Sequence, residues 1–94
     1  MAYSDAFPTF SPSSLPSIPT TWEDISWHQD GCPSWSATTG LIILVDFEEP
    51  SEREFPDSPR FHVMDPTGRD VVDVYDGDDW EEVLRRVDQW RTSN

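Results

Sequence analysis

Few side chains in this sequence have the chemistry for nucleophilic catalysis. Cys32 is the only cysteine, and His28 and His62 are the only histidines. A Cys–His pair becomes a nucleophile and base when a third group orients the histidine and a helix N-terminus or a cation activates the thiol. The sequence around Cys32 shows neither an orienting group nor an activating one. A lone cysteine beside Pro33 and between Trp27 and Trp35 is more often a small buried residue. We therefore predict that the protein is not an enzyme.

Four closely spaced aspartates are the candidate calcium ligands: Asp73, Asp76, Asp78 and Asp79. Placing the glycine of an EF-hand loop at Gly77 puts valines at two earlier ligand positions and at the closing position (Val72, Val74 and Val83). One cysteine and two histidines are also too few for a structural zinc site. The sequence contains no glycine-rich phosphate loop. We predict no bound metal and no cofactor.

Negative charge is the strongest feature of the chain. It has 19 acidic and 6 basic residues, all arginine, for a formal charge of −13. Fourteen acids fall in two segments, opposed within them by Arg53 and Arg69. Residues 46–57 hold six and residues 65–82 hold eight: Asp46, Glu48, Glu49, Glu52, Glu54 and Asp57, then Asp65, Asp70, Asp73, Asp76, Asp78, Asp79, Glu81 and Glu82.

Four of these fourteen acids have a local structural explanation. Glu81–Arg85 and Glu82–Arg86 are favourable i,i+4 helix pairs worth roughly 0.2–0.5 kcal/mol each, and Asp78 and Asp65 suit a helix cap and a turn. Ten acids remain, and they serve either solubility or recognition. For recognition, we predict that the main partner contacts are Glu48, Glu49, Glu52, Glu54, Asp70, Asp73 and Asp76.

The charge excludes some partners and favours others. Without a Lys/Arg cluster, the chain cannot neutralise phosphates, so neither nucleic acid nor an anionic membrane is an expected partner. The expected partner is instead a protein with a basic groove. Carboxylates on one face of a strand repeat about every 6.7 Å, which suits a groove built for successive phosphates. The sequence therefore suggests a mimic of the nucleic-acid backbone.

The elements that must hold these carboxylates centre on Leu41–Phe47, the longest apolar run. Three of its seven residues are β-branched, and Gly40 and Pro50 bracket it. This pattern predicts a strand buried on both faces near the middle of a small sheet.

The other strands are predicted at Trp22–His28, Ser34–Thr38, Pro59–Met64 and Asp70–Tyr75. In the third of these, Phe61 and Val63 face inward and His62 outward. Asp65-Pro66-Thr67-Gly68 is a strong turn signal that joins the last two strands as an antiparallel hairpin. Gly77 is expected to break the final strand.

A C-terminal helix is predicted to follow Gly77. Asp78 is the expected N-cap, with Glu81 completing a capping box. Its apolar stripe consists of Trp80, Val83, Leu84, Val87 and Trp90. The predicted fold is therefore α+β, a small antiparallel sheet of four to five strands with this helix packed on one face.

Residues 1–21 differ in composition from the single acidic domain expected over 22–94. Pro8, Pro12, Pro16 and Pro19 favour extended backbone. The segment is either a flexible leader or an arm that covers a sheet edge or grips a partner through its apolar residues, Tyr3, Phe7, Phe10, Leu15 and Ile18. No signal peptide is evident, and a single cysteine suits a reducing cytosol.

Small size, high acidity and the lack of a catalytic signature resemble the phage-encoded anti-CRISPR inhibitors, several of which mimic DNA. The resemblance rests on residues 46–57 and 65–82 and on a compact domain across 22–91. It implies a partner with a positively charged DNA channel, such as a Cas surveillance complex or nuclease, and action in the host cytoplasm. An immunity or antitoxin-like protein that neutralises a basic toxin, and an accessory domain whose acidity serves solubility, are the alternatives.

Overall fold

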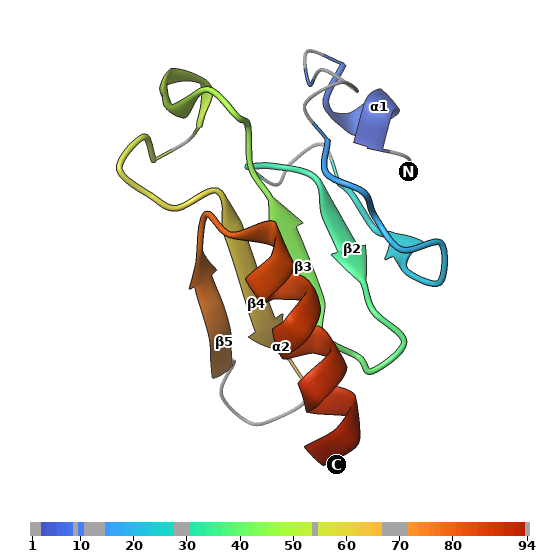
Figure 1. The fold of residues 1–94 in the computed structure, drawn as a ribbon. Coiled ribbons are helices and arrows are strands. Elements are labelled where there is room, and N and C mark those ends of the chain that lie inside the picture. The colour runs from blue at the N-terminus through green and yellow to red at the C-terminus, as the bar shows by residue number, and fades with distance from the viewer. Residues whose placement is uncertain are drawn as a thin grey trace.

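A computed structural model describes residues 3–8, 10, 15–27, 31–53, 55–66 and 72–93. It shows one five-stranded antiparallel sheet with a C-terminal helix on it (Figure 1), which confirms the predicted α+β class. The strands are β1 (Glu23–Asp24), β2 (Ser34–Ser36), β3 (Ile42–Val45), β4 (Phe61–Asp65) and β5 (Val72–Gly77). The helices are α1 (Tyr3–Ala6), the 3-10 turn η2 (Pro50–Glu52) and α2 (Trp80–Ser93).

The strands form a simple meander in the order β1-β2-β3-β4-β5, so β3 is central as predicted. The first strand is much shorter than the predicted Trp22–His28. After Asp24, the Ser26 hydroxyl donates to the Ser34 carbonyl and accepts from the Ser34 amide, at 3.3 and 3.0 Å. The Ile25 amide still donates to the Ser34 carbonyl, but the Ser26 side chain replaces the backbone acceptor for the Ser34 amide, and the ladder ends there. His28 lies outside the described residues.

Burial along β3 alternates, because the helix and the N-terminal segment together cover one face of the sheet. Leu41, Ile43 and Val45 are fully buried, whereas Ile42 and Leu44 are partly exposed on the opposite face. The prediction of burial on both faces is therefore wrong. Period-2 alternation is hidden in this sequence because the residues on the open face are also apolar.

The β4–β5 pair confirms the predicted antiparallel hairpin, with an irregularity between Val63 and Met64. Thr67–Val71 of its turn lies outside the described residues. Gly77 does not break β5, because it pairs with Phe61 as the last residue of the strand. A Cβ built on Gly77 would clash with the Tyr75 hydroxyl oxygen, so the glycine makes room for that ring.

The N-cap of α2 is Asp79, one residue later than predicted. Its Oδ1 accepts from the amides of Glu81 and Glu82 at 3.1 and 3.4 Å. Asp78 instead accepts from the Arg60 amide at 2.9 Å and so ties the start of the helix to the start of β4. Four of the five residues of the predicted apolar stripe face the core: Val83 and Val87 are buried in it, and Trp80 and Trp90 pack against it. Leu84 is partly exposed.

One of the two predicted helix ion pairs forms. Glu82 contacts Arg86 at 2.6 Å, as expected, and it also pairs with Arg85. The predicted Glu81–Arg85 pair is therefore wrong, because Glu82 reaches both arginines from the adjacent turn.

The N-terminal segment packs on the sheet beside α2. Phe7 and Phe10 are buried, while Tyr3, Leu15 and Ile18 pack against the same core. The rings of Tyr3 and Trp35 lie 5.8 Å apart, and those of Phe10 and Phe47 lie 5.1 Å apart. Residues 3–6 form a helical turn rather than extended backbone. The described apolar residues of the arm thus cover the part of the sheet that the helix leaves open.

Gly40 makes the tight turn between β2 and β3. The Ala37 amide donates to the Leu41 carbonyl, the Gly40 amide donates to the Ala37 carbonyl, and Gly40 has a φ of 91°. This is a three-residue hairpin loop with glycine in the left-handed region.

We expect Gly40→Ala to lower the free energy of unfolding by about 1–2 kcal/mol, because a Cβ strains this conformation. Urea denaturation measures the change. Thr38→Ala is the control, since Thr38 is an exposed residue of the same turn and no described residue other than glycine has a positive φ. Equal effects of the two substitutions would contradict the assignment.

Candidate functional site

The two acidic segments meet at one end of the sheet. Val45, Phe61 and Gly77 are register partners across β3, β4 and β5. The loop that follows β3 and the link between β5 and α2 therefore leave the sheet at the same end (Figure 1). We call this region the acidic end; its exposed carboxylates are Glu48, Glu49, Glu52, Asp57, Asp76, Asp78, Asp79 and Glu81.

The structure brings together four of the seven predicted contact residues. Glu48, Glu49 and Glu52 lie on the β3–β4 loop, and Asp76 lies near the end of β5. Asp73 does not join them, because it pairs with Met64 in the other half of the sheet. Glu54 and Asp70 lie outside the described residues.

Arg53 holds the β3–β4 loop from within. Its Nε donates to the Phe47 carbonyl at 2.7 Å, Nη1 to the Ser58 carbonyl at 2.9 Å and Nη2 to the Glu48 carbonyl at 3.2 Å. One planar guanidinium thus joins both ends of the loop through charge-assisted hydrogen bonds. The cation binds backbone oxygens and forms no ion pair with the carboxylates that the structure describes in this loop.

Arg60 connects the two acidic segments. Its Nε donates to the Asp46 carbonyl at 3.2 Å, and its guanidinium lies 5.1 Å from the centre of the Phe61 ring. Burial lowers the pKa of Arg60, while attraction to Glu48, Asp46 and Asp78 opposes that shift. Carboxylates from both segments therefore act on one partly buried cation.

Several carboxylates of the acidic end form no ion pair with a cation among the described residues. Within the described ranges, the side chains of Glu48, Glu49, Glu52 and Asp57 make no ion pair and accept no hydrogen bond. Of the described arginines, Arg53 binds carbonyls, Arg85 and Arg86 pair with Glu82, and Arg60 attracts Glu48. This end thus presents uncompensated charge to solvent.

Of the residues considered for catalysis, the structure describes Cys32 and His62. Cys32 is buried. His62 Nδ1 lies 2.7 Å from Asp76 Oδ1, and its Nε2 lies 3.0 Å from the Pro59 carbonyl oxygen. The histidine therefore links β4, β5 and the preceding loop. In the parts of the chain that the structure describes, no three or more His, Cys, Asp or Glu side chains are grouped to hold a metal ion.

Sequence reasoning missed part of this end. The sequence pattern assigns Asp78 to a helix cap and leaves Asp79 out of the predicted contacts, yet both carboxylates are exposed there. Phe55, in the acidic loop, is 67% exposed, whereas most of the aromatic side chains in the described ranges pack against the core. The available signal was a single phenylalanine between Glu54 and Pro56, in a segment with no apolar periodicity.

We expect Arg53→Lys to lower the free energy of unfolding by about 1 kcal/mol, because an ammonium cannot replace three bonds in the guanidinium plane. Amide exchange of Arg53 and Ser58, which donate within this loop, should become faster. Arg85→Lys is the control, since it preserves charge in an exposed pair. Unchanged exchange in Arg53→Lys would show that the loop does not depend on this side chain.

None of the helices in the described residues is long and apolar enough to cross a membrane. No protein-family model, curated protein sequence or solved structure matches this chain.

Proposed function

We propose that the protein is a non-enzymatic inhibitor whose acidic end occupies a basic nucleic-acid-binding groove of another protein. The observation that carries this proposal is the set of exposed, unpaired carboxylates on a loop that Arg53 fixes from within. A flexible acidic tail would lose conformational entropy on binding, and a preorganised loop loses less.

The partner is defined by its chemistry. Grooves that bind nucleic acid hold phosphates with Lys and Arg side chains, largely without reading sequence. Carboxylates fixed on a folded scaffold compete for the same cations. Phe55 adds an exposed aromatic side chain to this surface, of the kind that anchors protein interfaces. A Cas surveillance complex or nuclease in the cytosol is the partner that the resemblance to anti-CRISPR inhibitors suggests.

Competition with duplex DNA tests the proposal. The protein is used as bait, and the captured nucleic-acid-binding partner is purified and titrated with it. Duplex DNA should displace the protein, and the affinity should fall steeply as NaCl rises from 50 to about 200 mM. Binding that neither DNA nor salt weakens would overturn the proposal. Failure to capture any basic partner would favour acidity for solubility.

A further inference from the structure

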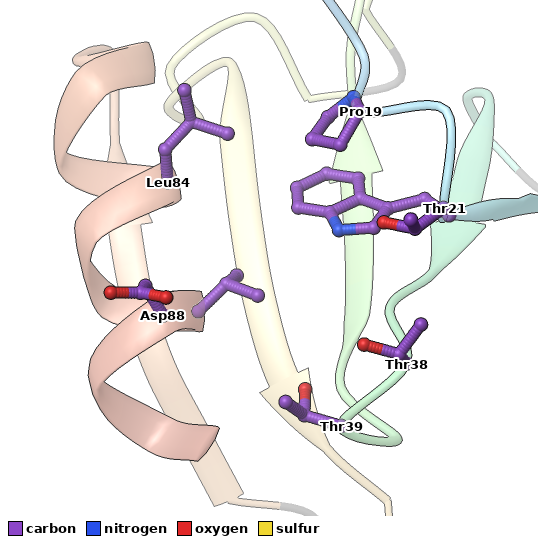
Figure 2. Close-up of a pocket in the computed structure, with 8 residues that line it drawn as sticks. Pro19, Thr21, Thr38, Thr39, Leu84 and Asp88 are labelled. Carbon is purple, nitrogen blue, oxygen red and sulfur yellow. The ribbon is translucent and has the colours of Figure 1, made fainter. Parts of the chain in front are cut away.

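A second feature lies away from the acidic end, between α2 and the start of the sheet. A cavity of about 190 Å³ opens there (Figure 2). The helix contributes Leu84, Val87 and Asp88 to one wall, and the β2–β3 turn contributes Thr38 and Thr39 to the other. Figure 2 shows the hydroxyl oxygen of Thr38 turned toward the helix. The indole of Trp22 completes the lining.

The charge in this lining comes from Asp88. Its carboxylate makes no ion pair or hydrogen bond within the described part of the chain. Arg85, three residues earlier on α2, pairs with Glu82 instead. Among the described residues Asp88 is therefore a carboxylate that a cation in the cavity could pair with.

The rest of the lining also suits a cation with an apolar stem. Tryptophan is the best aromatic partner for a cation, and a guanidinium stacks on it as a flat group. Leu84 and Val87 offer apolar surface to a stem. The Thr39 hydroxyl is buried without a hydrogen-bond partner among the described residues. After rotation about its Cα–Cβ bond, it can accept from a donor in the cavity.

We propose that this cavity binds an alkylguanidinium group, held between the Trp22 indole and the Asp88 carboxylate. The volume supports a group of this size. It slightly exceeds the roughly 150 Å³ that encloses benzene and lies below the about 300–1,000 Å³ of sites for larger ligands. The formal charge of −13 disfavours anions throughout. The group comes either from an arginine side chain of another protein or from a free alkylguanidine.

Titration monitored by NMR tests this site with three small probes. N-acetyl-L-arginine amide represents an arginine in a chain, agmatine represents a free alkylguanidine, and N-acetyl-L-leucine amide is the neutral control. We expect the two guanidines to bind with Kd values on the order of 1 mM and to shift the Trp22 indole N–H and the Leu84 and Val87 methyls. The probe that binds more tightly indicates whether the natural ligand is an arginine side chain or a free alkylguanidine. Equal shifts with the leucine amide would overturn the proposal.

Asp88→Asn, an isosteric change at an exposed position, should weaken guanidine binding at least fivefold. Asp73→Asn is the matched control, because it removes the same charge in β5 and should leave the Kd unchanged. Trp22→Phe, which retains a ring, should weaken binding by a smaller factor. Wild-type affinity in Asp88→Asn, or shifts confined to the Glu48–Glu52 loop, would contradict the assignment. These measurements need no protein partner and therefore stand apart from the proposed inhibitor function.

Discussion

Phe10→Ala is expected to lower the free energy of unfolding by about 3–4 kcal/mol, as for other buried phenylalanines. Phe10 is only 3% exposed, and its ring contacts those of Tyr3 and Phe47. Small domains are stable by about 5–15 kcal/mol, so this loss is a large fraction of the total. Urea denaturation followed by tryptophan fluorescence measures it.

Phe55→Ala is the matched control, because it makes the same chemical change at a side chain that is 67% exposed. Its effect should stay within about 0.5 kcal/mol. A small effect at Phe10 as well would mean that residues 1–21 do not contribute to the folded core. A large effect at Phe10 alone would establish the N-terminal segment as part of the domain.

The packing of this segment could not be decided from the sequence. Apolar residues separated by prolines are compatible with a flexible leader and with a covering arm, because neither interpretation requires a periodic pattern. The width of the sheet favours the covering arm, because one helix is too narrow to cover all five strands. α2 packs against β4 and β5, so apolar residues near β2 and β3, such as Trp35 and Phe47, need another cover. That requirement becomes visible only when the strand order is known.

The central strand and the helix were predictable because their patterns are local. The apolar run around Ile43 and the stripe around Val83 each indicate the correct element. The position of the helix cap could not be predicted from the sequence, since Asp78 and Asp79 are both good N-caps. The choice depends on the Arg60 amide, which binds Asp78 and leaves Asp79 to cap the helix. A contact between distant residues thus decides a local feature.

The acidic end was predictable in outline, because antiparallel strands bring the two acidic segments to one end of the sheet. Its detail was not. The irregular β4–β5 pairing places Asp73 opposite Met64, away from the other predicted contacts. Arg53 was counted as a charge opposing the acids, whereas it binds three carbonyl oxygens. Composition gives the sign of a surface charge, but geometry decides which charges remain uncompensated.

The separation of Asp73 from the acidic end yields the second large prediction. With the captured nucleic-acid-binding partner, the double substitution Glu48→Gln and Glu49→Gln should weaken binding about 10–30-fold at low salt. Both side chains are exposed and make no ion pair within the described residues. Their loss should therefore leave stability nearly unchanged and reduce the dependence of affinity on NaCl. Isothermal titration calorimetry at several salt concentrations measures both quantities.

The control is Glu23→Gln with Asp73→Asn, which removes the same two charges from the other half of the sheet. Glu23 pairs with Ser36 and Asp73 with Met64, and Ile42 pairs with both Ser36 and Met64. If net charge alone drives binding, the two double variants weaken it equally, and the geometry of the acidic end is irrelevant. If the carboxylates act as fixed substitutes for phosphates, only the first variant loses affinity, because its charges lie on the loop that Arg53 holds in place.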